Sequence, residues 1–138
     1  MDALLDAIAA FLASPADKIF VGRLEETART ALAVATPEVF LSADTLAKQR
    51  REYPEMTTNE YLLLPLVLET PDLVLQWEDL RVAVLRAGPH DLVAAAKGTI
   101  ERHDSYVAGF RRRGREDVRR MLRKARLLFG DASGWSRR

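Results

Sequence analysis

The stretch Leu80–Arg113 constrains the fold of this chain more than any other segment. It contains three short runs in which apolar residues alternate with polar or small ones, and turn-forming residues at Gly88-Pro89 and Glu101–Asp104 separate the runs. β-Branched and aromatic residues between turn formers indicate strands, and such short links favour antiparallel neighbours. The sequence therefore predicts a three-stranded antiparallel meander with strands at about Arg81–Arg86, Leu92–Thr99 and Ser105–Arg111.

Segments before and after the meander have apolar residues at helical spacing. Before it, helices are expected at Asp2–Leu12, Leu24–Val34, Ala43–Arg51 and in a segment that Pro65 divides and that Thr57 or Thr58 caps, with Glu60 placed for a capping box from Thr57; a short strand is expected at Val39–Leu41. After it, Arg115–Phe129 has an apolar stripe made by Val118, Met121, Leu122, Ala125, Leu128 and Phe129. The expected fold is α+β: N-terminal helices packed on a small antiparallel sheet (residues 81–111), followed by a C-terminal amphipathic helix and a tail at 131–138.

Length and composition describe one soluble globular domain, because the chain has 138 residues, of which 48% are hydrophobic and 30% charged. Cysteine is absent, which excludes disulfides, thiolate catalysis and cysteine-ligated zinc. The apolar segment Ala3–Leu12 is interrupted by Asp6 and has no basic region before it, so it resembles neither a signal peptide nor a membrane span. We therefore expect a protein that is neither secreted nor bound to a membrane.

Charge is distributed unevenly along the chain. Residues 1–110 hold 10 Lys/Arg and 17 Asp/Glu, whereas residues 111–138 hold 11 Lys/Arg and 3 Asp/Glu. An acidic body with a basic C-terminal end indicates a polyanionic partner or an acidic protein surface, unless the two parts neutralise each other within one fold. The densest basic run is Arg111-Arg112-Arg113-Gly-Arg115, which either holds phosphates at a strand end or forms a solvated turn.

General catalytic signatures are absent. The chain has no phosphate-binding loop, no dinucleotide-binding glycine motif and no His-Glu-x-x-His motif, and its two histidines, His90 and His103, are too few to indicate a metal site. We expect no metal and no cofactor.

From about Asp17 to Arg113 the order of motifs is more informative than any single motif. The segments are KIFVGRL, VFLSADTLAKQRREYPEMTTNEYLLLPLVLETPDLV, LRVAVLRAG, LVAAAKGT and SYVAGFRRR. Their order resembles the phage-associated branch of the barnase/EndoU/colicin/RelE-like nuclease fold. The resemblance implies helices packed on one face of an antiparallel sheet, with a nuclease-like core at 36–113, a helical lead-in at 1–35 and a basic helix at 115–129 within a single domain, 1–130.

The resemblance also implies metal-independent cleavage of RNA through the 2′-hydroxyl, which needs a base, an acid and cations around the phosphate. The histidine and the serine or threonine typical of this branch fall on Tyr53 and Gly109 here, so both are replaced. Lys97 and Arg111 match its basic positions. If the protein is active, the catalytic candidates are Lys97, Arg111, Tyr53 and His103.

Three functions remain open from the sequence. The preferred one is a non-catalytic phage-derived module that acts through protein–protein contacts as a virion or head-morphogenesis component, in the host cytoplasm or in the virion. The others are a metal-independent RNase resembling a toxin and a nucleic-acid-binding module. For contacts with a partner or nucleic acid, the candidate residues are Arg111, Arg112, Arg113, Arg115, Arg119, Arg120 and Arg123.

Overall fold

The computed structural model describes residues 2–34, 36–99 and 104–135. The elements, in chain order, are α1 (Ala3–Ala13), β1 (Lys18–Arg23), α2 (Glu26–Leu32), β2 (Glu38–Ser42), α3 (Ala43–Glu52), α4 (Thr58–Leu62), α5 (Leu64–Glu69), β3 (Leu73–Trp77), β4 (Leu80–Ala87), β5 (His90–Thr99), β6 (Asp104–Gly114), α6 (Arg115–Lys124), β7 (Arg126–Gly130) and the 3₁₀ turn η1 (Ala132–Trp135). The class is α+β, as the sequence predicts. Among the described residues, no helix has the length and apolar character needed to cross a membrane.

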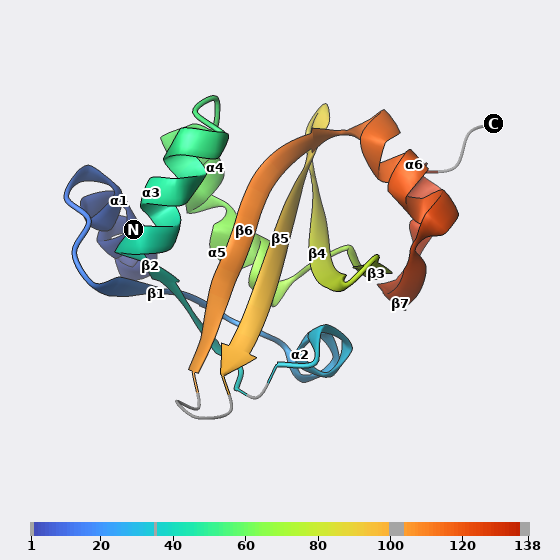
Figure 1. The fold of residues 1–138 in the computed structure, drawn as a ribbon, viewed down its shortest axis with the longest axis horizontal. Coiled ribbons are helices and arrows are strands. Elements are labelled where there is room, and N and C mark those ends of the chain that lie inside the picture. Colours follow the sequence, from blue (N-terminus) through green and yellow to red (C-terminus); the bar gives the residue numbers. More distant parts are fainter. Residues whose placement is uncertain (1, 35, 100–103, 136–138) are drawn as a thin grey trace.

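The sheet is larger than predicted. It has seven strands in the order β1-β2-β6-β5-β4-β3-β7, and it is mixed because β2 and β6 run parallel while the other neighbours are antiparallel. The predicted meander, β4 to β6, lies in its middle (Figure 1). The prediction of a small three-stranded sheet is therefore wrong: β1, β2, β3 and β7 extend the meander on both sides.

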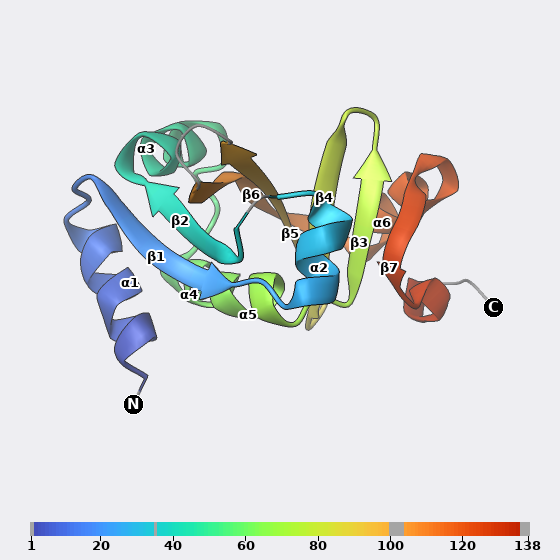
Figure 2. The same cartoon turned by 90° about the horizontal axis from the view of Figure 1, so that it is seen from below.

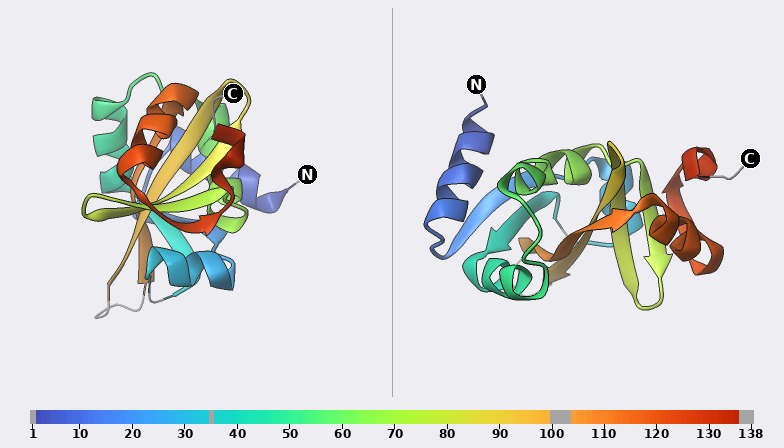
Figure 3. Two further views of the ribbon diagram at one scale, coloured as in Figure 1. Left: turned by 90° about the vertical axis from the view of Figure 1, so that its right-hand side faces the viewer. Right: turned by 90° about the horizontal axis from the view of Figure 1, so that it is seen from above.

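Helix α1 and strand β7 lie at opposite ends of the elongated molecule, as the view from below shows (Figure 2). The views from the side and from above show the sheet twisting strongly between these ends (Figure 3). Because of this twist, different helices cover different parts of the sheet, and the two faces have separate hydrophobic cores.

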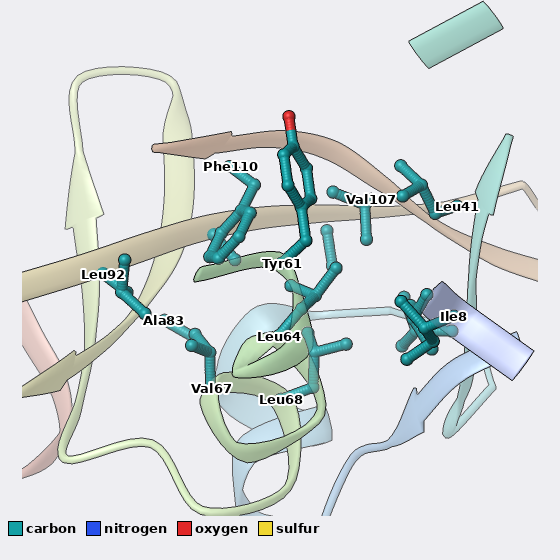
Figure 4. Packing of buried hydrophobic residues seen from close by; sticks show 14 of the residues in the cluster. Ile8, Leu41, Tyr61, Leu64, Val67, Leu68, Ala83, Leu92, Val107 and Phe110 are labelled. Carbon is teal, nitrogen blue, oxygen red and sulfur yellow. The ribbon is translucent and has the colours of Figure 1, made fainter. Parts of the chain in front are cut away.

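The larger core lies where α1, α4 and α5 pack on the sheet. Strands β5 and β6 contribute Leu92, Ala94, Val107 and Phe110 to this core, and a register shift between Val107 and Gly109 brings Val107 and Phe110 to the same face. Figure 4 shows Phe110 beside Tyr61, with Leu64 and Leu68 below them. The rings of Tyr61 and Phe110 meet edge to face with centroids 5.6 Å apart, a favoured aromatic geometry.

The smaller core lies on the opposite face of the sheet. It is built from Leu73, Leu75, Val82, Val84, Val93, Val118, Met121 and Trp135, so that α6 and η1 cover strands β3 to β5. The alternation that predicted the strands thus supplies two buried faces instead of one.

Helix starts follow the predicted capping residues. Ser42 accepts a hydrogen bond from the Thr45 amide at the start of α3, and Thr57 and Glu60 form a capping box at the start of α4. A proline in the first turn of α5 separates that helix from α4, as the sequence predicts for Pro65.

The C-terminal helix is shorter than predicted. α6 ends at Lys124, Ala125 is extended, and Arg126–Gly130 forms β7 along the edge of β3. Apolar residues in this segment fit either a helical or a strand pattern, and pairing with the free edge of β3 decides between the two. The predicted helix over Arg115–Phe129 is therefore wrong in its last five residues.

The segment expected to be a tail contains η1. Within it, Trp135 is buried, its indole Nε1 donates to Asp91 Oδ2 at 2.7 Å, and its carbonyl accepts from Arg119 Nε at 2.6 Å. These contacts fix η1 against β5 and α6, and residues 136–138 lie outside the described part of the chain.

Candidate anion-binding cleft

A cleft lies between α3 and α6, on the sheet face that carries the smaller core. Its floor is formed by β5 and β6, including Val93, Ala95 and Gly109. Figure 1 shows α3 and α6 on either side of these two strands. One wall comes from the last turns of α3 with Tyr53, and the other comes from Met121 of α6 and from the β3–β4 hairpin.

Two arginines of β6 line this cleft. Arg111 and Arg113 are two residues apart on one strand, so both side chains lie on the same face of the sheet. The Arg111 guanidinium is 4.6 Å from the ring centroid of Tyr53, and that of Arg113 is 5.5 Å from the ring centroid of Trp77. Both distances fit a cation–π contact, so aromatic rings hold the two guanidinium groups in place.

No described acidic side chain pairs directly with these two arginines, although the charge of Asp117 acts on Arg113 from a distance. The Nε atoms of Arg111 and Arg113 are buried and have no hydrogen-bond partner, and neither residue forms an ion pair with any described residue. Burial lowers the pKa of Arg113 below its usual value, and repulsion from Arg111 lowers it further. An anion bound to the two guanidinium groups would offset the repulsion between them.

Arg112, between them, has a different role because its side chain lies on the opposite face of the sheet. Its Nε donates to Glu60 Oε2 at 2.5 Å and its Nη2 to Glu60 Oε1 at 2.7 Å, and Nη2 also donates to the Glu55 carbonyl at 2.9 Å. The bidentate contact lowers the pKa of Glu60 to about 2. Arg112 therefore joins β6 to α4 and does not reach the cleft.

Arg115 is also committed to the fold. Its Nε donates to Asp91 Oδ1 at 2.9 Å, and its Nη2 donates to the Gly88 carbonyl at 2.9 Å. Asp91 is fully buried and its other oxygen accepts from Trp135. This buried carboxylate connects β5, the start of α6 and η1, and Arg115 neutralises it.

The three remaining candidates lie on α6. Arg119 pairs with Glu116 at 2.7 Å besides contacting η1, and Arg120 pairs with Asp117 at 3.1 Å. A second hollow is lined by Arg120, Arg123 and Lys124 together with Asp117, and it shares Trp77, Arg113 and Met121 with the cleft. The two hollows are therefore contiguous, and the cationic lining continues from β6 along α6.

Of the four catalytic candidates, the structure brings Tyr53 and Arg111 together but not Lys97. Tyr53 lies in the cleft against Arg111, but Lys97 lies in a separate exposed hollow with Arg81 and Asp79. His103 lies outside the described residues. No group of acidic residues and histidines in the described part of the chain could hold a metal ion.

Sequence reasoning missed several polar and aromatic residues of the cleft: Lys48 and Glu52 on its α3 wall, and Trp77 and Gln49. Gln49 is 3% exposed, and its Nε2 donates to the carbonyl of Phe110 on the edge of β6. Neither Trp77 nor Gln49 belongs to a recognisable motif, and both reach the cleft only through the tertiary fold. Gly109 was identified only as a replacement of the family's serine or threonine, whereas the structure places it on the floor beside Gln49.

A scan against protein-family models, a search of curated proteins and a search of solved structures gave no match. The resemblance to the nuclease fold therefore stays a prediction.

Proposed function

We propose that this protein binds single-stranded RNA by placing phosphates on Arg111 and Arg113, and that it does not cleave the strand. The observation that carries the proposal is the pair of partly buried guanidinium groups that form no ion pair with a described acidic side chain. Guanidinium groups without a direct acidic partner are well suited to bind phosphate. RNA is chosen because the sequence resemblance implies a fold that acts on RNA.

The surroundings of the two arginines support a strand rather than an isolated phosphate. Proteins that bind single strands combine a cationic groove along the backbone with aromatic side chains near the bases. Here Tyr53 and Trp77 lie in the cleft, and Arg123 and Lys124 continue the cationic lining on α6. The contiguous hollows offer cations to several successive phosphates.

The expectation that the strand is not cleaved rests on the loss of the family's histidine and hydroxyl, although one carboxylate, Glu52, lines the cleft. No imidazole of the described residues lines the cleft, and the family's histidine and hydroxyl positions are occupied by Tyr53 and Gly109. General acid–base catalysis typically contributes 10²- to 10⁴-fold in rate, so its loss leaves a site that binds phosphate without efficient turnover.

This proposal favours nucleic acid over the protein partner that the sequence alone suggested. The reason is that two of the four arginines of the basic run, Arg112 and Arg115, are paired within the fold, as is Arg119 on α6. The free charge is concentrated in a cleft instead of being spread over a flat face. A role in phage head assembly or in the virion stays a prediction from the resemblance.

Binding to a fluorescein-labelled RNA of about eight nucleotides tests the proposal, since single-strand sites typically span about 4–16 nucleotides. The double variant Arg111→Gln/Arg113→Gln is expected to bind at least about tenfold more weakly than the wild type. The matched control is Arg23→Gln/Arg51→Gln, which removes the same charge from two exposed positions that do not line the cleft. Equal weakening by both double variants would show that only net charge matters and would refute the proposal.

A further inference from the structure

The orientation of the Gln49 amide is fixed by the edge of β6. Strand β2 pairs with β6 only at Ser105 and Tyr106, so α3 covers the following part of that edge. There the Gln49 amide meets the carbonyl of Phe110, which can only accept a hydrogen bond. The amide nitrogen must therefore face Phe110, and Oε1 must point the other way.

Oε1 of Gln49 points towards Gly109 on the cleft floor. A Cβ atom added at Gly109 would have Oε1, at 3.9 Å, as its nearest contact. No hydrogen bond to Oε1 is formed by a described residue, although the Gln49 side chain also interacts with the buried Tyr61 hydroxyl, which has no other hydrogen-bond partner among these residues. The cleft thus contains one oriented acceptor beside its two cationic side chains.

Gly109 is not required by the backbone. Its φ lies outside the left-handed region, and an added Cβ would make only an ordinary van der Waals contact. A glycine inside a strand weakens the strand and often marks a place where a ligand approaches closely. At this position, the missing side chain leaves open the space in front of Gln49 Oε1.

An isolated acceptor distinguishes nucleobases by the group they present to it. An exocyclic amino group, N4 of cytosine or N6 of adenine, donates to the amide oxygen, whereas the O4 carbonyl of uracil is repelled by it. Cytosine and uracil have nearly the same size, so this difference separates them without any steric selection.

We propose that Gln49 and Gly109 form a base-recognition subsite in which Gln49 Oε1 accepts a hydrogen bond from the exocyclic amino group of a cytosine or adenine. The inference rests on the proposed function, because the arginines bring the strand into the cleft. It adds a preference among sequences that phosphate contacts cannot provide.

The test compares oligo(rC), oligo(rA) and oligo(rU), each of about eight nucleotides, by fluorescence anisotropy at one salt concentration. The wild type should bind the cytosine and adenine strands about five- to tenfold more tightly than the uracil strand, the effect of one directed hydrogen bond.

Gln49→Met should remove the preference but also loses the contact with Phe110. Gly109→Val is therefore the decisive variant, because it fills the space in front of Oε1 and leaves that contact intact. Gly109→Ala is the matched control and should retain the preference.

Each outcome has a distinct meaning. Loss of the preference in Gly109→Val but not in Gly109→Ala supports the subsite. Equal binding of the three strands by the wild type, or a preference that persists in Gly109→Val, overturns the subsite and leaves the proposed function standing. If the wild type binds none of the strands, the proposed function fails and the subsite fails with it.

Discussion

Replacing Arg112 by glutamine should destabilise the protein in a pH-dependent way, although Arg112 lies between two residues assigned to binding. The side chains of Arg112 and Glu60 are 27% and 17% exposed, and the pKa of Glu60 falls from its usual 4.5 to about 2. A difference of this size corresponds to about 3 kcal/mol. Because water reaches part of the pair and screens it, we expect a loss of about 1–2 kcal/mol at neutral pH.

The pH dependence follows from the direction of the Glu60 shift. Its pKa is lower in the folded state than in the unfolded one, so the ion pair stabilises the fold fully above pH 4.5, and this contribution is lost as pH falls towards 2. The difference in unfolding free energy between wild type and Arg112→Gln should therefore shrink over that interval. A small remainder should persist from the hydrogen bond to the Glu55 carbonyl.

Urea denaturation at neutral pH and at several values between 4.5 and 3 measures this difference. Arg113→Gln is the matched control, because it removes the same charge one residue away, at a position that forms no ion pair with a described acidic side chain. The control should leave the free energy of unfolding unchanged or raise it slightly. Two results would contradict the assignment of Arg112 to stability and Arg113 to binding. One is a loss of unfolding free energy with Arg113→Gln as large as with Arg112→Gln. The other is a loss with Arg112→Gln that does not vary with pH.

Three further predictions concern the buried carboxylate, the β7 turn and catalysis. Asp91→Ala should lower the free energy of unfolding by about 3–5 kcal/mol, because it leaves the partly buried Arg115 unpaired. Urea denaturation measures this loss, and a value below about 1 kcal/mol would contradict the role of Asp91 as the buried partner of Arg115. Gly130→Ala should lower the melting temperature more than Gly88→Ala, since both have positive φ but only the Cβ at Gly130 would clash, 2.0 Å from the Asp72 carbonyl oxygen. Purified protein should show little RNase activity, and robust EDTA-resistant cleavage that disappears in Lys97→Ala would restore the enzyme hypothesis.

The sequence predicts the middle of the sheet well and its margins poorly. Strands β4 to β6 were located because turn formers bound each alternating run, and that signal is local. The end of α6 was misplaced because Leu128 and Phe129 continue its apolar spacing, while the free edge of β3 that captures this segment is remote in sequence. The spacing of apolar residues within a segment does not show which edge of the sheet is free to pair with that segment.

The sequence identified the basic residues of the candidate site but not how they are arranged in space. The basic run on β6 was identified from the sequence. Because side chains alternate between the two faces of a strand, Arg112 lies on one face and its two neighbours lie on the other. This alternation could have been predicted from the sequence. The acidic partners Glu60 and Asp91 could not have been found, because they come from elements far away in the chain. Trp77, the aromatic partner of Arg113, could not have been found for the same reason.

The salt dependence of RNA binding tests the central claim most directly, because it counts phosphate contacts. For single strands, each phosphate neutralised contributes about −0.7 to the slope of log affinity against log salt concentration. Changing both Arg111 and Arg113 to glutamine should therefore make the slope less steep by about 1.4, whereas Arg23→Gln/Arg51→Gln should leave it close to that of the wild type. An unchanged slope in the cleft variant would show that these two arginines do not hold phosphates and would contradict the account.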